Sequence, residues 1–187
     1  AIPGATSLRS VDVSGGVATI DLDSDFVSGG GSFSMRSRLA QVIYTATRVE
    51  GVTSVRILLD GTPTTVFGGE GVTIASPAGR SGFDDLLPAI FVETPVFGGF
   101  APNPAIVEGS ANTFEGTVRV VLTDAEGLIL FDGFTTAACG SGCRGDFRLV
   151  IPYSVDRPQI GSLIVFEESP ADGSQINVRE YAVGLAP

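Results

Sequence analysis

The sequence contains no histidine, no lysine and no tryptophan, and it contains only one methionine and two cysteines. Histidine is the commonest general base of enzymes and the commonest metal ligand of proteins. Its absence excludes a Ser-His-Asp triad, a Cys-His pair and a zinc site of the HExxH type. Hydrolysis by a pair of carboxylates stays open, because that chemistry needs only Asp and Glu.

Positive charge is also scarce, and all of it comes from arginine. The 11 basic residues stand against 21 Asp and Glu residues, which leaves a net charge of -10. An acidic surface repels phosphate backbones, and no cluster of arginines alternates with aromatic residues, so the sequence predicts no nucleic-acid partner. Contact with anionic lipid headgroups is disfavoured for the same reason.

Long apolar runs are absent as well. The longest are a few residues each, which is too short for a transmembrane helix or for the apolar core of a signal peptide. The chain starts at Ala1 and not at a methionine, so either a targeting segment was removed or the chain was trimmed. Its 43% hydrophobic residues, 25 glycines and 11 prolines are typical of a folded protein rich in strands and turns.

The two cysteines, Cys139 and Cys143, are separated by three small residues in CGSGC. An even number of cysteines at close spacing predicts a local disulfide, and therefore an oxidising compartment outside the cytoplasm; two free thiols are the alternative. A zinc ion needs about four ligands, and two thiols without histidine supply only half of them. We therefore expect no metal ion and no cofactor.

The first half of the chain has the pattern of a small sheet with one helix. Apolar segments flank Gly15-Gly16, a pair that favours a hairpin turn. Over 35–46 the apolar residues recur at helical spacing, with serines ahead of them as candidate caps and Gly51 behind them as a stop. A strand over 52–59 and an Asp60-Gly61 turn follow. This order predicts an α+β module with one main helix on one face of the sheet.

The composition changes between 68 and 90, where Gly, Pro and Asp accumulate. Such a stretch predicts a domain boundary, and we divide the chain into 1–85 and 86–187. Beyond Pro88 no helical period recurs. Seven short apolar segments, separated by Gly, Pro, Asn or Asp, predict an all-β immunoglobulin-like sandwich.

The run Asn112-Thr113-Phe114-Glu115 allows two interpretations. Asn112 and Glu115 are the polar pair of an active site, or the run is a corner in which Phe114 fills the core and Glu115 accepts backbone hydrogen bonds. A carboxylate catalyst needs a second carboxylate at a set distance, and the sequence marks no partner. We therefore favour a structural role for these four residues as a marker of the fold.

Two other sets of acidic residues are candidate calcium ligands. Asp21, Asp23 and Asp25 alternate in DLDSDF and would share one face of a strand, where a calcium ion needs six to eight oxygen ligands. The favoured interpretation is the solvated face of an amphipathic strand. For a further set of acidic residues we prefer a role in forming turns, with calcium binding as the alternative: Asp124, Glu126, Asp132 and Asp172.

Two aromatic residues stand out as candidates for contact with another surface. Phe97 and Phe100 lie in PVFGGFAPNP, a loop rich in Gly and Pro where large apolar side chains have little core to enter. We expect them to seal the junction between the two domains or to contact a partner protein, with the junction preferred.

Two sets of motifs resemble known families. Within 1–85, the segments GVATIDLDSDF, RLAQVIYTAT, VTSVRILLDG and GGEGVTIASPAGR are similar to the GerMN domain of bacterial sporulation and spore-germination proteins. Within 86–187, the segments GSANTFEGTVRVVLTDAEG, GFTTAACGSGCRGDFRLVIPY and GSLIVFEESPADGSQINV resemble the immunoglobulin-like domain of bacterial spore germination. Together they cover nearly the whole chain, and the second resemblance is the more specific.

The resemblance implies a protein of the Gram-positive cell envelope, often a lipoprotein whose anchor would precede Ala1. It also implies contacts with envelope or membrane proteins and self-association, because GerMN domains are similar to the ring-building modules of secretion-type assemblies. Neither family is associated with a catalytic motif. We therefore expect a non-enzymatic interaction or assembly scaffold, with a module for cell-wall polymer or a calcium-dependent ligand as the alternative.

Overall fold

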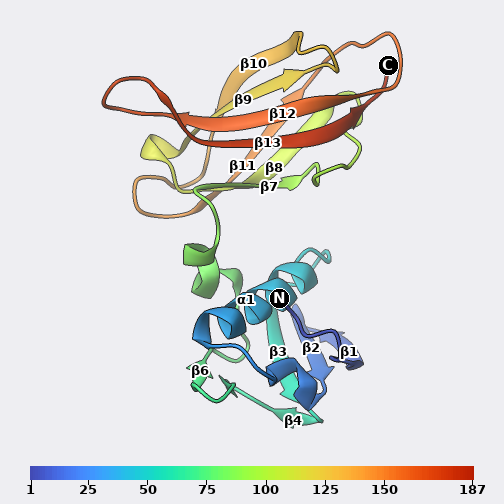
Figure 1. The fold of residues 1–187 in the computed structure, drawn as a ribbon, viewed down its shortest axis with the longest axis vertical. Coiled ribbons are helices and arrows are strands. Elements are labelled where there is room, and N and C mark those ends of the chain that lie inside the picture. The colour runs from blue at the N-terminus through green and yellow to red at the C-terminus, as the bar shows by residue number, and fades with distance from the viewer. The chain divides into compact units, whose positions relative to one another are not determined.

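A computed structural model describes all 187 residues. The chain divides into two compact units, Ala1–Leu86 and Leu87–Pro187, and each has a hydrophobic core of its own. In Figure 1 the first unit is coloured blue to green and the second green to red.

The first unit is an α+β module. Its four-stranded sheet has the order β1-β2-β3-β4, in which β2 and β3 are parallel and the other neighbours antiparallel. The strands are β1 (Leu8–Ser14), β2 (Val17–Leu22), β3 (Ser54–Leu59) and β4 (Thr62–Pro63). The predicted hairpin at Gly15 and Gly16 is confirmed, and both glycines have positive φ angles of 57° and 80°, which favour residues without a Cβ.

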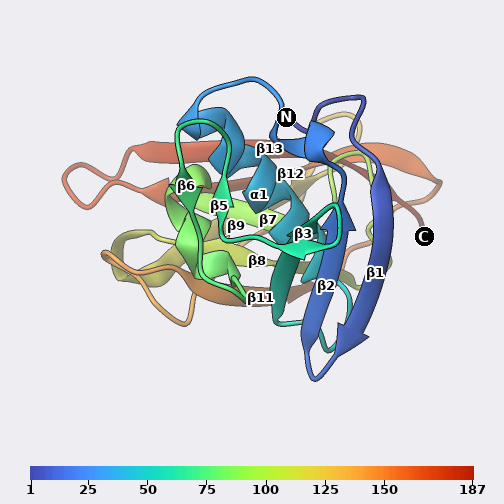
Figure 2. The same cartoon turned by 90° about the horizontal axis from the view of Figure 1, so that it is seen from below.

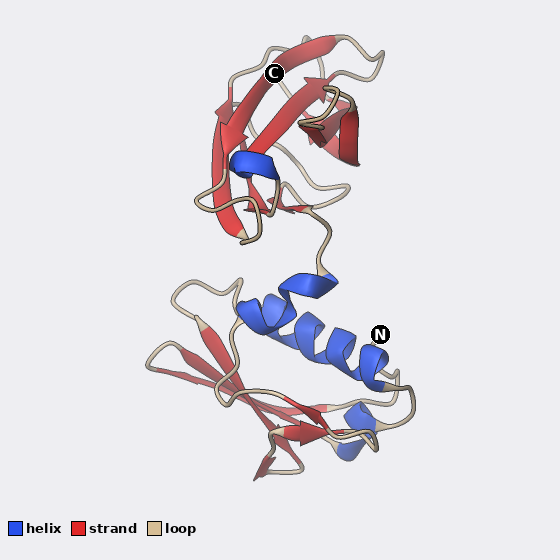
Figure 3. Cartoon of the chain, turned by 90° about the vertical axis from the view of Figure 1, so that its left-hand side faces the viewer, coloured by secondary structure: helices blue, strands red, loops and turns tan.

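Helix α1 (Ser32–Ala46) lies across one face of this sheet, as Figure 3 shows. Its buried stripe of Met35, Leu39 and Ile43 contributes to the core of the unit, as the helical spacing predicts. Strands β2 and β3 supply the opposite side of that core through alternating apolar residues: Ala18, Ile20, Leu22, Val55 and Ile57.

The cap at the start of the helix differs from the prediction. The N-cap residue is Gly31, and no serine side chain caps the helix. A carboxylate oxygen of Glu70 accepts the hydrogen bond from the Ser32 N–H instead. Glu70 lies in the turn between β5 (Val66–Phe67) and β6 (Val72–Thr73), and a negative charge is favourable at the positive end of a helix. At its other end the helix stops at Ala46, where the predicted stripe ends, and a turn that contains Gly51 follows.

Arg38 is a buried charged residue of the first unit. Its side chain is 5% exposed and donates four hydrogen bonds to backbone carbonyl oxygens, at distances of 2.9 to 3.1 Å. The acceptors are Ala1, Phe26, Ser28 and Gly29. The guanidinium group therefore joins the start of the chain and the glycine-rich loop 28–31 to the helix. The first unit continues with a 3₁₀ helix (Arg80–Leu86) whose Phe83 is buried in the same core.

The second unit is the predicted sandwich of seven strands. One sheet has the order β10-β9-β12-β13 and the other β11-β8-β7. The strands are β7 (Ile90–Thr94), β8 (Ala105–Ala111), β9 (Thr117–Thr123), β10 (Ile129–Thr136), β11 (Gly145–Ile151), β12 (Gln159–Glu168) and β13 (Gln175–Leu185). Neighbouring strands are antiparallel, and alternate residues of both sheets form the core. Every helix in the chain is too short or too polar to cross a membrane.

Candidate functional site

The three candidate calcium ligands Asp21, Asp23 and Asp25 do not form a common site. Strand β2 ends at Leu22, so Asp23 and Asp25 lie beyond it and do not share a strand face with Asp21. Asp21 accepts a hydrogen bond from the Gly61 N–H and pairs with Arg9, whose Nε is 3.4 Å from its Oδ2. No group of three or more His, Cys, Asp or Glu side chains is placed to hold a metal ion.

Asp23 makes a structural contact at the edge of the sheet. Its Oδ2 accepts a hydrogen bond from the backbone N–H of Ser7 at 3.0 Å. This bond lowers the pKa of the Asp23 carboxyl, because it favours the charged form. The carboxylate therefore fixes the segment that leads into β1.

The prediction of turn-forming acids is confirmed for Asp124 and Asp172 but is wrong for Asp132, which lies within strand β10. Asp124 accepts hydrogen bonds from the backbone N–H groups of Glu126 and Leu128. Asp172 accepts them from the N–H and hydroxyl of Ser174, which lowers the pKa of the Asp172 carboxyl. Asp132 pairs with Arg119 on the neighbouring strand at 2.7 Å.

The Asn112–Glu115 run is a corner between β8 and β9 that joins the cysteine loop. Asn112 accepts a hydrogen bond from the Gly142 N–H, and the Thr113 carbonyl accepts one from the Ser141 N–H. Cys139 and Cys143 form the predicted disulfide at the ends of that loop. The corner and the loop therefore hold each other in place.

Two details of this corner were predicted wrongly. Phe114 is 48% exposed and does not fill the core. Glu115 is exposed, and the carboxylate that accepts backbone hydrogen bonds is Glu167. Glu167 is buried and accepts from the Phe114 N–H at 2.6 Å and from the Asn177 amide at 2.8 Å. Phe114 is 53 positions from Glu167 in the sequence, so no local motif pointed to this contact.

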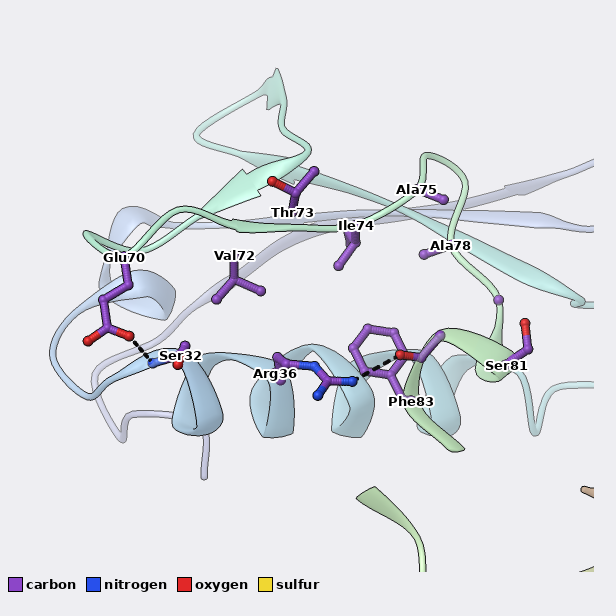
Figure 4. Close-up of a pocket in the computed structure, with 12 residues that line it drawn as sticks. Ser32, Arg36, Glu70, Val72, Thr73, Ile74, Ala75, Ala78, Ser81 and Phe83 are labelled. Atoms are coloured by element: carbon purple, nitrogen blue, oxygen red, sulfur yellow. Dashed lines mark hydrogen bonds between the residues drawn. The ribbon is translucent and has the colours of Figure 1, made fainter. Parts of the chain in front are cut away.

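A groove of about 520 Å³ with a mixed polar and apolar lining lies in the first unit between α1 and the extended segment 70–79. Figure 4 shows Val72 and Ile74 facing the helix, with Glu70 near one end and Phe83 near the other. Its two charged groups already have partners inside the unit. Glu70 accepts from the helix N-terminus, and Arg36 donates to both carboxylate oxygens of Asp85 and to the Gly82 carbonyl. The groove therefore holds no pair of carboxylates suited to hydrolysis.

The ion pair at this groove predicts a pH dependence. The hydrogen bond from Arg36 lowers the pKa of the Asp85 carboxyl below its ordinary value of 3.8. A carboxyl with a lowered folded-state pKa stabilises the fold above pH 3.8, and the contribution is lost as the pH falls through the folded-state pKa. We expect the stability difference between the wild type and Asp85→Asn to shrink as the pH falls below 3.8 and to vanish below the folded-state pKa of Asp85, when measured by urea unfolding. A difference that persists at low pH would contradict this.

A second groove, of about 450 Å³, is apolar and lies between α1 and strand β1. Leu8, Val11 and Val13 of β1 line it, and they are 62%, 54% and 53% exposed. On the helix side, its lining includes Val42 and Val49. Strand β1 pairs only with β2, so its other edge has no strand partner, as Figure 2 shows.

Phe97 and Phe100 lie on the surface of the second unit, 73% and 61% exposed. They follow strand β7, which begins at Ile90 near the point where the chain enters this unit and ends at Thr94. Their loop is therefore at the opposite end of β7 from that entry.

Two family models match the chain. Residues 1–65 match the family described as sporulation and spore germination, and residues 89–174 match the immunoglobulin-like domain of bacterial spore germination. No curated protein matches.

Solved structures of the sporulation protein GerM from Bacillus subtilis are also similar. Its first GerMN domain is 20% identical, with a TM-score of 0.39, and the match covers 43% of this chain and 59% of that chain. Its tandem GerMN domains are 16% identical, with a TM-score of 0.41, over 83% of this chain and 44% of that chain. This chain thus spans about half the length of the GerM chains that it matches. The chain is therefore a GerMN domain of the sporulation and spore-germination type followed by an immunoglobulin-like domain of bacterial spore germination.

Proposed function

We propose that the protein is a non-enzymatic interaction module that acts outside the cytoplasm, in the cell envelope. The observation that carries the proposal is the open apolar face of the first unit. Monomeric proteins rarely expose continuous apolar surface, and an uncovered surface of this kind is a frequent mark of a protein contact. The disulfide and the two germination-type domains support a place outside the cytoplasm. A lipid anchor ahead of Ala1 is part of the same proposal.

The open face combines two features that suit a protein partner. Leu8, Val11 and Val13 lie opposite buried residues of β2 and extend the apolar face of the sheet beyond the part that α1 covers. The free edge of β1 adds unpaired backbone groups, which can pair with a strand of a partner. Envelope proteins and a second copy of the chain are the partners that we propose.

A glutamate on this face is expected to abolish the contact. Val11→Glu places a charge on the apolar face, and binding of the captured partner should fall at least about tenfold, a loss of about 1.4 kcal/mol. The readout is a pull-down from solubilised envelopes of the source bacterium, with mass spectrometry to identify the partner. Sedimentation of the purified chain tests self-association. Val66→Glu is the matched control, because Val66 is also 54% exposed but lies on β5.

The result decides between the proposed function and its alternative. Equal capture by the wild type, Val11→Glu and Val66→Glu would exclude the β1 face. Capture of wall polymer alone would favour a polymer-binding module. Thermal stabilisation of the chain by calcium would favour a calcium-dependent ligand, since a ligand that binds only the folded state raises its stability.

A further inference from the structure

A second apolar surface lies at the end of the sandwich where β7 and β9 end and β12 begins. We call this the distal end, and Figure 1 shows it at the right-hand side of the second unit, with the C-terminus. Six large apolar side chains there are 50% to 73% exposed. They are Val96, Phe97, Phe100, Leu128, Ile129 and Ile160.

Phe100 and Ile160 belong to one continuous surface. Phe100 forms a β-bridge with Gly184, and Ile160 is the register partner of the same glycine on β12. Val183 and Leu185 point into the core, so Gly184 and its partner Ile160 face outward. A Cβ on Gly184 would lie 3.5 Å from Cδ2 of Phe100, which shows that the phenyl ring lies over this glycine.

The backbone of the aromatic loop is held in place. The N–H of Gly98 donates to the Ala182 carbonyl and that of Ala101 to the Gly184 carbonyl, while Gly184 donates to Gly99, all at 2.8 to 2.9 Å. The Tyr153 hydroxyl donates to the Ala101 carbonyl at 2.7 Å. Because this backbone is already ordered, binding through the loop needs little further backbone ordering, and aromatic side chains in such positions are typical of binding hot spots.

The charged groups at the distal end are mainly acidic. Asp124 and Glu126 lie in the turn between β9 and β10, and this turn contacts the start of β12 through a hydrogen bond from the Ala125 N–H to Gln159. Asp156 lies in the loop before β12, and the neighbouring Arg157 is 4.0 Å from Glu126. The apolar surface is therefore bordered by net negative charge.

We propose that the distal end binds a protein whose apolar pocket receives Phe97 and Phe100 and whose rim carries Arg or Lys. The acidic border selects a basic partner and disfavours an anionic membrane, which would repel it. The inference rests on the proposed function, because it names a second contact surface of the same interaction module.

The test replaces the two aromatic residues in the full chain. Phe97→Ser together with Phe100→Ser should reduce capture of an envelope protein at least tenfold, whereas Phe134→Ser should leave it unchanged. Phe134 is the matched control because it is 61% exposed, like Phe100, but lies on β10. The captured protein is identified by mass spectrometry, purified and titrated against each variant. Raising salt from about 0.05 to about 0.5 M should slow association, since it screens the acidic border.

The variants in this test distinguish the β1 face from the distal end as the binding surface. Capture that is lost with Val11→Glu but kept with the double serine variant would refute the distal site and leave the proposed function intact. Capture unaffected by either change would refute both. Three further outcomes would overturn the distal protein site. The first is a loss of capture with Phe134→Ser as large as with the double serine variant, and the second is an association rate that does not change with salt. The third is binding of the chain to phosphatidylglycerol vesicles. Unfolding curves that match the wild type show that the double variant is folded.

Discussion

Replacing Arg38 with methionine is expected to destabilise the first unit by about 3 kcal/mol. Methionine fills a similar volume but donates no hydrogen bond, so four buried or partly buried carbonyl oxygens lose their partner. Each unsatisfied buried acceptor costs about 1 to 3 kcal/mol, and water that enters the site recovers part of this. The loop 28–31 should open first, because three of the four acceptors lie in it or directly before it.

Amide hydrogen exchange of α1 and β3 measures this loss directly. Hydrogen exchange measures the stability of the first unit by itself. A single unfolding midpoint of a two-unit chain does not separate the stabilities of the two units. Arg56→Met is the control, because Arg56 lies exposed on β3 and its replacement should change stability by less than about 0.5 kcal/mol. Arg38→Lys should fall between the two, since an ammonium donates fewer hydrogen bonds than a guanidinium. Equal protection in Arg38→Met and the wild type would contradict the structural role of Arg38.

Replacing Gly109 with alanine is expected to cost the second unit about 3 kcal/mol or to prevent its folding. Gly109 lies in β8, the central strand of its sheet, opposite Val92 at a register shift in β7. A Cβ there would lie 2.1 Å from the Phe91 carbonyl oxygen and 3.0 Å from the Phe147 ring. The backbone of β7 must therefore move, which disrupts hydrogen bonds in the interior of the sandwich.

The control for this prediction is Gly184→Ala. Gly184 lies in the same unit, and the nearest neighbour of its added Cβ would be at 3.5 Å, an ordinary contact distance. Amide hydrogen exchange of the second unit should separate the two variants by about 2 kcal/mol or more, the order of magnitude for overpacking. Similar protection in both variants would show that β7 relaxes around the extra methyl group.

Periodicity allowed most of the architecture to be predicted. The hairpin at Gly15-Gly16 and the main helix depend on short-range patterns of apolar residues and glycine, and both are confirmed. The sandwich followed from seven short apolar segments, and each of them is a strand. Such patterns are local, because side chains alternate in a strand and repeat every three to four residues in a helix.

The polar contacts were predicted less well, because their partners are far apart in the chain. The helix cap was expected from a serine beside it, but it comes from Glu70. The acceptor at the 112–115 corner was expected to be Glu115, but it is Glu167. Arg38 gave a local signal that was overlooked: it lies three residues after Met35, beside the apolar stripe of the helix.

The sequence by itself determined the two-part architecture, the disulfide between neighbouring cysteines and the exclusion of histidine-dependent chemistry. These follow from composition and from spacing along the chain. Only the tertiary structure decided which apolar residues stay exposed. Leu8, Val11 and Val13 have the pattern of a buried strand face, yet α1 leaves β1 uncovered. Phe100 and Ile160 are 60 positions apart in the numbering and meet only through Gly184. The physical reason is that exposure depends on what packs against a side chain, and that is set by contacts between distant segments.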